Sequence, residues 1–503
     1  MERITSLIDH KLKRFNDVIV ALPSYSITLF ILLAAFLALL PEWLNYDIMS
    51  RDGAHLYLPV AGLFLQGKFH EAVLGLYHPT YPLPLYEFLT FLVAKIFAFD
   101  LELSGRLVSA AGYIIGAVGI YKASDVIFKD KIISLLSVLF YLSNRELLDR
   151  ADDCLIESLL VCLVVWGNYF VLKGINSLKR AKNFTIGTIF FVSGALVRST
   201  SLIFLIAWLL IWVFYKKDGI IKRMSIFLLP IVAIILLWFF RDSLPIVVGP
   251  IFNKSYNLKM FFSVNIGFFN TIKATLYFLN QFIDRTHYLV GLFGIYGIFL
   301  MRRNIYALQL SIAVLLLYVV CMRMGWNFTD RASDRYILVG IICLLPMSAY
   351  AVNGAIKSTR KFLKIIAVLT IIACPFLWAD KAFDPPDPDK LARKEAGQWI
   401  LSQVGSKSYI LTDRERIVFY ADGIALHLKK FKQLRKKRDM VAVNYRIHKW
   451  ISFAELKEFK THGLVIAIDM KHDNSKIVEG KLKNLGYEPD KKFRTVYVYL
   501  PNS

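Results

Sequence analysis

The chain has 503 residues, of which 56% are hydrophobic, and a formal net charge of +23 at pH 7. A water-soluble protein of this length needs a larger share of polar residues to cover its surface, so the composition excludes an ordinary soluble enzyme. The basic residues cluster between apolar segments, where the positive-inside rule and lipid phosphates favour them. This arrangement argues against a nucleic-acid-binding protein.

A basic N-terminal segment precedes the first apolar run, which extends from about Tyr25 to Leu40 and ends at Pro41. A cleaved signal peptide has a shorter apolar region that is followed by small residues at the cleavage site. We therefore predict that this run stays in the protein as a first membrane helix and that the N-terminus is cytoplasmic.

The next segment, residues 44–105, is apolar but is interrupted by proline, glycine and ionisable residues such as Asp52 and Glu87. These interruptions disfavour a straight span, so we predict an outer loop with short helices that lie along the membrane interface. A full span over 82–99 is the alternative. It would invert the sidedness of every later helix and would place the basic stretch at Arg180 outside.

The apolar segments beyond residue 105 predict further membrane helices, for a total of about eleven, and a second outer loop over 241–286. In this predicted membrane topology, the stretches assigned to the cytoplasm are rich in Lys and Arg, whereas the carboxylates lie mostly on the opposite side. The predicted helices cover about 107–121, a segment ending at 141, 155–172, a hairpin around 198–200, 226–240, segments ending at 302 and 323, 336–357, and a last helix that leaves the membrane near 378.

The composition changes at about Asp380, and the proline-rich stretch 385–388 is typical of a linker. We predict two domains: a transmembrane catalytic domain over 1–379 and a small soluble extracytoplasmic α/β domain over 380–503. Within the second domain, the residue patterns predict one helix over Leu391–Val404 and short strands over Ser408–Thr412, Gly463–Asp469 and Thr495–Leu500.

Several motifs follow one another in a set order along the chain. Asp52 comes after the first helix, Pro84-Leu85-Tyr86 follows about thirty residues later, and Arg106-Leu107 opens the next helix. Asp334-Arg335-Tyr336 precedes a late helix. This order resembles the family of protein mannosyltransferases and bacterial aminoarabinose transferases, which are multi-spanning GT-C glycosyltransferases that use polyprenyl-phosphate sugars. Many members have Asp-Glu after the first helix, where this chain has Asp52-Gly53.

The resemblance implies an α-helical polytopic membrane protein with a GT-C fold and a glycosyltransferase activity. The enzyme would move a hexosyl or pentosyl group from a polyprenyl-phosphate carrier to a glycan, lipid or protein acceptor. The reaction would take place on the outer face of the inner (plasma) membrane. It requires no cofactor; a divalent cation is allowed, but no metal-ligand spacing in the sequence supports one.

Asp52 is the candidate catalytic residue. Transfer of a sugar to a hydroxyl requires a group that takes the acceptor proton, and a carboxylate is the usual one. The leaving polyprenyl phosphate is already a stable anion, so the paired carboxylates of ordinary glycoside hydrolysis are not needed. A single base, Asp52, is therefore sufficient, and we predict a direct displacement that inverts the configuration of the sugar carbon. The structural alternative is that Asp52 pairs with Arg51 or caps a short helix over Gly53–Phe64.

The donor phosphate requires positive charge at the outer surface. Arginine suits this role because it binds phosphate through two donors and keeps its charge. The alternative is that an arginine at a helix end contacts lipid headgroups. The candidates are Arg198, Arg335, Arg331 and Arg106, with Lys254 and Lys259 as further cations.

A second acidic group consists of Asp152, Asp153 and Glu157. These carboxylates could orient the acceptor, bind a divalent cation, or balance Arg145 and Arg150 as solvated surface charges. The three interpretations differ in whether the carboxylates meet a substrate, a metal or only neighbouring arginines.

Aromatic residues of the first outer loop suit a cleft for the sugar or the prenyl chain, and they suit an interfacial aromatic belt equally well. The residues concerned are Tyr57, Tyr81 and Tyr86, with His55 beside them. The basic run Lys429–Arg438 could hold an anionic acceptor, contact headgroups, or remain a solvated charged face.

A transporter or flippase of a lipid-linked sugar is the main rival, and a non-catalytic assembly subunit is a third class. A transporter would place ionisable residues at the middle of the membrane and would show paired broken helices in two related halves. The predicted spans are nearly free of central charges and no such repeat is visible, which favours an enzyme whose charges gather at one surface.

Overall fold

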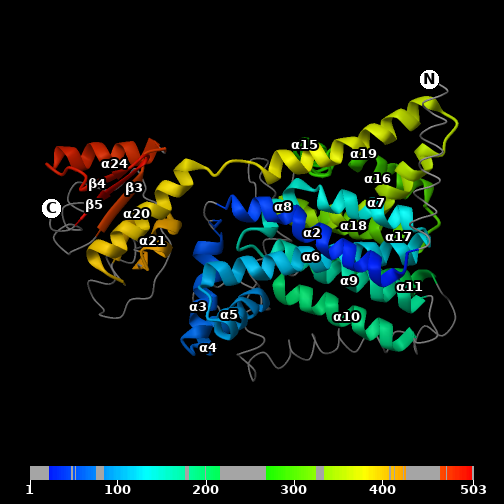
Figure 1. Ribbon diagram of the computed structural model, residues 1–503, viewed down its shortest axis with the longest axis horizontal. Helices are drawn as coiled ribbons and strands as arrows, with labels where there is room; N and C mark the ends of the chain where they lie inside the picture. Colours follow the sequence, from blue (N-terminus) through cyan, green and yellow to red (C-terminus); the bar gives the residue numbers. More distant parts are fainter. Residues whose placement is uncertain are drawn as a thin grey trace.

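The computed structural model describes residues 22–46, 49–50, 52–74, 84–175, 180–198, 200–215, 268–323, 334–406, 409–412, 414–422, 424–425, 465–471 and 473–500. Their backbone forms a large helical bundle with a smaller five-stranded sheet and its helices beside one end of it (Figure 1). We call the smaller part, from α20 (Pro388–Val404) to β5 (Val496–Tyr499), the sheet unit.

Five helices of the described chain are long and apolar enough to cross a membrane. A span needs roughly 20 apolar residues to cover about 30 Å of hydrocarbon. The five are α2 (Ser24–Leu44), α6 (Leu101–Phe128), α9 (Glu157–Ile175), α18 (Asp334–Ile356) and α19 (Lys361–Ala382). The other bundle helices are α7 (Lys131–Leu142), α8 (Arg145–Ala151), α10 (Arg180–Val197), α11 (Ser201–Tyr215), α15 (Phe268–Asp284), α16 (Leu289–Leu300) and α17 (Ile305–Arg323).

The boundaries of α6 differ most from the prediction, which placed that helix at about 107–121. The helix starts earlier because Asp100 caps it, its side chain accepting a hydrogen bond from the Leu103 N–H at 2.8 Å. It ends at Lys129, which adopts a left-handed backbone conformation with φ of 52°. The predicted helix over 226–240 lies outside the described residues.

The predicted outer loop over 44–105 contains short helices in the described structure. They are a π-helical turn η1 (Gly53–Tyr57), α3 (Leu58–Leu65), α4 (Phe69–Leu74) and α5 (Leu85–Phe97). The 13 residues of α5 correspond to a length of about 20 Å, which is shorter than a span requires. A π-helical turn is rare and often lies at a functional site, and this one begins directly after Asp52.

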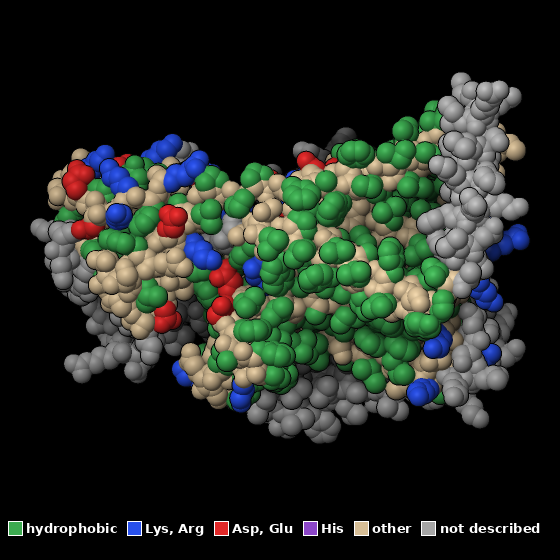
Figure 2. All heavy atoms as spheres, in the orientation of Figure 1, with side chains coloured by type: hydrophobic (Ala, Val, Ile, Leu, Met, Phe, Trp, Pro, Cys, Tyr) green, Lys and Arg blue, Asp and Glu red, His purple; other side chains and the backbone are tan. Residues whose placement is uncertain are grey.

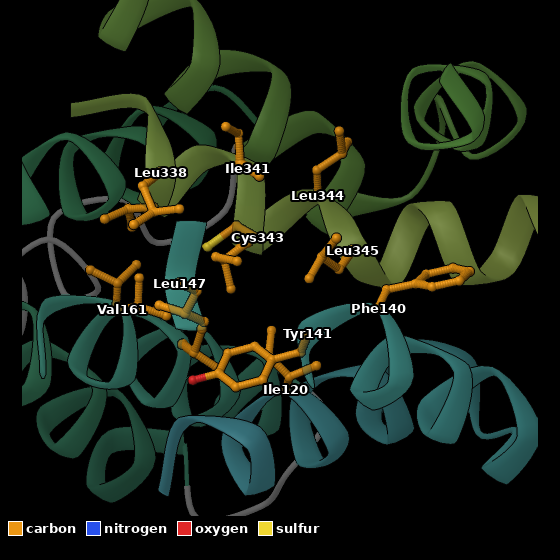
Figure 3. Close-up of a cluster of buried hydrophobic side chains, with 14 of the residues drawn as sticks. Ile120, Phe140, Tyr141, Leu147, Val161, Leu338, Ile341, Cys343, Leu344 and Leu345 are labelled. Atoms are coloured by element: carbon orange, nitrogen blue, oxygen red, sulfur yellow. The ribbon is translucent and has the colours of Figure 1, made fainter. Parts of the chain in front are cut away.

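The core of the bundle forms around α18, which packs against α7, α9, α16, α17 and α19. In Figure 3, side chains of α18 such as Leu345 face apolar side chains of four other helices, whereas Ile341 and Leu344 point to the opposite side of α18. The facing side chains are Val161 of α9, Leu147 of α8, Ile120 of α6, and Phe140 and Tyr141 of α7. This burial fixes the central helix, whose N-terminal turn carries Arg335.

Small residues let α6 and α9 cross closely. A Cβ added at Gly112 would lie 2.8 Å from the backbone nitrogen of Leu159 and 2.9 Å from its Cα. Glycine at such a crossing lets two backbones approach within van der Waals contact. The crossing therefore holds the first turn of α9, with Glu157, against the middle of α6.

The sheet unit consists of helices α20 (Pro388–Val404), α21 (Glu415–Tyr420) and α24 (Asp473–Asn484), and strands β1 (Tyr409–Thr412), β2 (Ile424–Ala425), β3 (Val465–Asp469), β4 (Lys491–Phe493) and β5 (Val496–Tyr499). The strand order is β2-β1-β3-β5-β4. β1 pairs in parallel with β2 and β3, and β5 pairs antiparallel with β3 and β4.

Side chains alternate between the two faces of this sheet, as the two-residue period of a strand requires. Val465 and Ala467 of β3 face α20 and α21, whereas Ile466 and Ile468 face α24. The strand is buried along its whole length, so it carries apolar residues on both faces. β2 and β4, which lie at the edges of the sheet, were not predicted; β2 has only two residues and β4 is lysine-rich.

Asp469 ends β3 in a buried position between two arginines. Its Oδ2 accepts hydrogen bonds from Arg393 Nε and Arg414 Nε, both at 2.9 Å. Burial opposes ionisation, but the Arg393 and Arg414 guanidinium groups hold the pKa of Asp469 below its usual range. The carboxylate therefore links α20 and the segment before α21 to the central strand.

Charges are divided between the two ends of the bundle. In Figure 2, hydrophobic side chains cover the bundle, whereas Asp, Glu, Lys and Arg gather on the sheet unit and at its junction with the bundle. The charged side chains visible at the opposite end of the bundle in this view are Lys and Arg. Four basic residues lie where α18 is joined to α19: Lys357 and Arg360 between the two helices, and Lys361 and Lys364 in the first turn of α19.

Candidate active site

Asp52 lies between the end of α2 and the turn η1, on a short segment that is held by backbone contacts. The Ser50 N–H donates to Asp153 Oδ1 at 2.8 Å, and the Gly53 N–H donates to Ser50 Oγ at 3.1 Å. The Asp52 side chain is 29% exposed and makes no cap hydrogen bond to η1. These contacts anchor the segment while leaving the carboxylate accessible.

Arg335, 283 residues further along the chain, donates from Nη1 to Asp52 Oδ2. Its Nε also lies 3.8 Å from Glu157 Oε1. The same Glu157 oxygen accepts a hydrogen bond from Arg198 Nη1 at 3.2 Å. We call Asp52, Glu157, Arg198 and Arg335 the charge cluster. Four separate segments of the chain therefore bring two carboxylates and two guanidinium groups together.

Burial within the charge cluster is uneven. Glu157 is fully buried, and its Oε2 has no hydrogen-bond partner among the described residues. The side chains of Arg335 and Arg198 are 21% and 16% exposed. A buried charge is tolerated only when it is paired, so Glu157 depends on both arginines.

Aromatic rings surround the cluster. The Arg198 guanidinium lies 5.0 Å from the centre of the Tyr336 ring, within the range of a cation–π contact. Tyr57 is fully buried and its ring meets that of Tyr86 edge-on, with 5.6 Å between the centroids. The Tyr86 hydroxyl donates to the Gly105 carbonyl at 2.9 Å. Tyr57 and Tyr86 are therefore buried against each other, and their predicted role in a substrate cleft stays a prediction.

Arg106 occupies a different place from the other candidate arginines. Its Nε donates to the Asp152 carbonyl at 2.8 Å and its Nη2 to the Trp43 carbonyl at 2.9 Å. Its guanidinium also stacks on the rings of Trp43 and Tyr46, 4.2 and 3.6 Å from their centres. These contacts tie α6 to the end of α2. A phosphate-binding role for Arg106 would have to compete with them, and it remains a prediction.

The second acidic group is divided by the fold. Glu157 joins the arginines, whereas Asp152 and Asp153 lie in the turn between α8 and α9. Asp153 Oδ1 accepts hydrogen bonds from the Ser50 and Cys154 N–H groups, and burial raises the pKa of Asp153 to about 6. Burial and the neighbouring Asp153 carboxylate raise the pKa of Asp152 as well. Within the described parts of the chain, no three His, Cys, Asp or Glu residues are grouped so that they could hold a metal ion.

Several candidates cannot be placed. Arg331, Tyr81, Lys254, Lys259 and the run Lys429–Arg438 lie outside the described residues, and so does the side chain of His55. Their predicted roles stay predictions.

Glu102 is a residue that the sequence did not single out. It lies in the first turn of α6, where an acidic residue is common because it complements the helix dipole. Nothing in the local pattern separates it from an ordinary first-turn glutamate. In the folded chain its carboxylate accepts hydrogen bonds from Tyr46 and Tyr420, which lie far from it in the sequence.

Gly53 replaces the second carboxylate of the family pattern, and the fold leaves little space for a side chain there. A Cβ at residue 53 would lie 3.0 Å from Cys154 Cβ and 3.1 Å from the Cys154 carbonyl oxygen. The Gly53→Ala variant should therefore push η1 and Asp52 away from the turn before α9. We expect a loss of about 1–3 kcal/mol in stability and a roughly tenfold slower transfer, measured as thermal unfolding and as initial rate in detergent.

The matched control for this variant is Gly354→Ala in α18, where a Cβ would meet no atom within 4 Å. That substitution should be neutral or slightly stabilising, because alanine favours a helix more than glycine does. Equal effects of the two variants would contradict the steric explanation for Gly53.

Comparison with known proteins places the fold. The model of the family described as dolichyl-phosphate-mannose-protein mannosyltransferase matches residues 77–240. The structure is similar to ArnT from Cupriavidus metallidurans bound to undecaprenyl phosphate, with a TM-score of 0.66, 12% identity, and coverage of 96% of this chain and 99% of ArnT. No curated protein matches the sequence.

The structure is also similar to the archaeal oligosaccharyltransferase AglB from Archaeoglobus fulgidus in complex with an inhibitory peptide and a dolichol-phosphate. The TM-score is 0.55, with 12% identity and coverage of 88% of this chain and 69% of AglB. The family match and both structural matches confirm the resemblance that the motifs indicated. The chain has the GT-C fold of membrane glycosyltransferases.

Proposed function

We propose that the chain is an inverting glycosyltransferase that moves one sugar from a polyprenyl-phosphate carrier to an acceptor hydroxyl. The reaction takes place at the outer, extracytoplasmic face of the inner (plasma) membrane. The observation that carries this proposal is the pairing of Asp52 with Arg335 next to the Glu157–Arg198 pair. A partly exposed carboxylate and two cations suited to phosphate lie in one place, and this is what the reaction requires.

The reaction is a single displacement at the anomeric carbon of the sugar. The acceptor oxygen forms the new C–O bond on the side opposite the phosphate, and the old C–O bond breaks with its electron pair leaving on the phosphate oxygen. Asp52 takes the acceptor proton as the new bond forms. The leaving phosphate is a stable anion, so no acid has to protonate it. One displacement inverts the configuration of the sugar carbon.

Arg335 and Arg198 bind the donor phosphate, and Glu157 positions them. Glu157 contacts both arginines, so its buried carboxylate sets the spacing of their guanidinium groups. In the described state Arg335 is paired with Asp52. A bound phosphate offers Arg335 a second anionic partner through bidentate hydrogen bonds, which leaves the Asp52 oxygens available for the acceptor hydroxyl.

The relatives support the class of donor and leave the acceptor open. The ArnT structure holds undecaprenyl phosphate, and the AglB structure holds a dolichol-phosphate and an inhibitory peptide. A polyprenyl-phosphate carrier is therefore the donor that we propose for this chain. The acceptor is a glycan, a lipid or a protein, and the transferred sugar is a hexosyl or pentosyl group.

The proposal includes an architecture and a sidedness. We infer about eleven spans within 1–379, outer loops over 44–105 and 241–286, and an extracytoplasmic α/β domain over 380–503 in the inner (plasma) membrane. The charge distribution supports this orientation, because the bundle end that is rich in Lys and Arg would face the cytoplasm. The charge cluster and the sheet unit then share the outer side.

Mass spectrometry of glycans tests the function. Glycolipids and glycoproteins from cells lacking the chain should miss one hexose or pentose residue that is present in cells expressing it. Purified protein in vesicles should convert a radiolabelled polyprenyl-phosphate sugar to polyprenyl phosphate and labelled acceptor. If glycans are unchanged and the labelled lipid only changes leaflet, the chain is a flippase and the proposal is wrong.

A further inference from the structure

One carboxylate links the sheet unit to the segment that bears Asp52. Glu102 Oε1 accepts hydrogen bonds from the Tyr46 hydroxyl at 2.8 Å and from the Tyr420 hydroxyl at 2.6 Å. Its Oε2 lies 3.8 Å from Lys394 Nζ. Tyr46 follows α2, Tyr420 ends α21, and Lys394 belongs to α20. A single side chain at the start of α6 therefore joins three parts of the fold.

The Tyr420 side chain also contacts the segment before Asp52. It packs against Met49, three residues before Asp52, while its hydroxyl donates to Glu102. Burial and the Glu102 carboxylate raise the pKa of Tyr420, so the hydroxyl remains protonated as a donor at neutral pH. The Tyr420 side chain therefore links the sheet unit to α6 and to the segment that leads to Asp52.

Apolar contacts also join the sheet unit to the segment around Asp52, and we call this contact region the junction. Phe419 and Tyr420 pack against a small buried cluster that contains Met49, Ala54 and Leu58. Met49 lies three residues before Asp52 in the chain, and Ala54 lies two residues after it in η1. The sheet unit thus contacts the chain on both sides of Asp52, and α21 packs directly on η1.

These contacts matter because residues 45–46 and 49–50, which lead from α2 to Asp52, are not helical. A segment without helical hydrogen bonds depends on its neighbours for a defined position. Proton transfer requires the base to be held within hydrogen-bond reach of the acceptor, and a displacement of about 1 Å can cost roughly 10²-fold in rate. The contacts of Glu102, Phe419 and Tyr420 restrict this freedom.

We propose that Tyr420 and Glu102 are positioning residues through which the sheet unit holds Asp52 in its catalytic geometry. This inference rests on the proposed function and extends it: the C-terminal unit acts on the rate of transfer without touching the reacting atoms. It predicts a change in kcat with little change in the donor KM, because the arginines that bind the phosphate lie on α18 and after α10.

Kinetics of purified full-length variants test the proposal. Tyr420→Phe and Glu102→Ala should each lower kcat about tenfold and leave the donor KM within about twofold. The double variant should be no slower than the slower single variant, because both substitutions break the same hydrogen bond. Glu102→Gln keeps a side-chain oxygen for both tyrosines and should retain most of the activity.

Tyr497→Phe is the matched control. Tyr497 lies on β5 and packs in the cluster between the sheet and α24, on the face opposite α20 and α21. Its substitution removes a hydroxyl from the same unit but leaves the junction intact, so kcat should not change. An equal loss in Tyr497→Phe and Tyr420→Phe would overturn the proposal in favour of general destabilisation.

Hydrogen exchange gives a second readout that does not depend on activity. Backbone amides of residues 46–58 should exchange several-fold faster in Tyr420→Phe than in wild type, while those of β3 should not change. Unchanged exchange and unchanged kcat in an active enzyme would overturn the positioning role alone. Faster exchange in a protein whose wild type transfers no sugar would support the positioning role and defeat the proposed function.

Discussion

Replacing Asp52 by asparagine is expected to lower the rate of sugar transfer by about 10³-fold, the size of effect that loss of a general base produces. The amide keeps the shape of the carboxylate, and its oxygen can still accept a hydrogen bond from Arg335. Donor binding and folding should therefore persist. The measurement is single-turnover transfer from a labelled polyprenyl-phosphate sugar at saturating acceptor.

Asp380→Asn is the control for the Asp52 variant. Asp380 pairs with Arg145 in an exposed salt bridge, with side chains 67% and 51% exposed. Such surface pairs contribute little to stability, so the same chemical change there should leave transfer intact. Full activity in Asp52→Asn would show that another group takes the acceptor proton, and the mechanism proposed here would then be wrong.

Replacing Arg335 by glutamine should weaken donor binding about 100-fold, because charge-assisted hydrogen bonds to the phosphate are lost. Arg335 is also the residue that contacts both carboxylates of the charge cluster. Arg335→Lys keeps the charge but cannot bind phosphate in a bidentate manner, and we expect an intermediate affinity. Binding of labelled polyprenyl phosphate to the purified protein measures this effect separately from chemistry.

Arg145→Gln is the corresponding control, because it removes an arginine from an exposed surface pair on the same side of the bundle. Its affinity for polyprenyl phosphate should match that of the wild type. If Arg335→Gln bound the phosphate as tightly as wild type does, the donor would have to lie elsewhere. Arg335 would then serve only to pair with Asp52 and Glu157.

The membrane helices are predictable because their signal is local. Each apolar run must be long enough to bury its own backbone polar groups in lipid, and basic residues mark its cytoplasmic end. The predicted run over 155–172 corresponds to α9, and the hairpin around 198–200 corresponds to the join of α10 and α11. The buried strand β3 is visible for the same reason: a short apolar run bounded by polar residues.

Individual site residues are predictable in part. Asp52, Arg198 and Arg335 stand out because they are ionisable residues at the ends of apolar segments and because they match the family motifs. Their grouping is not predictable from composition. Glu157 stands with Asp152 and Asp153 in the sequence but pairs with arginines from two other helix ends in the fold. The α6–α9 crossing at Gly112 helps to decide this, because it sets where α9 begins against α6.

Hydropathy and charge along one segment act over a few residues, so the order of the helices can be inferred from the sequence, and the side of the membrane that each end faces stays a prediction from it. The pairing of Asp52 with Arg335 spans 283 residues. Glu102 and Tyr420 meet only because the sheet unit packs on η1. Such pairs depend on how buried surfaces from distant parts of the chain pack together, so they cannot be predicted from any local pattern of residues.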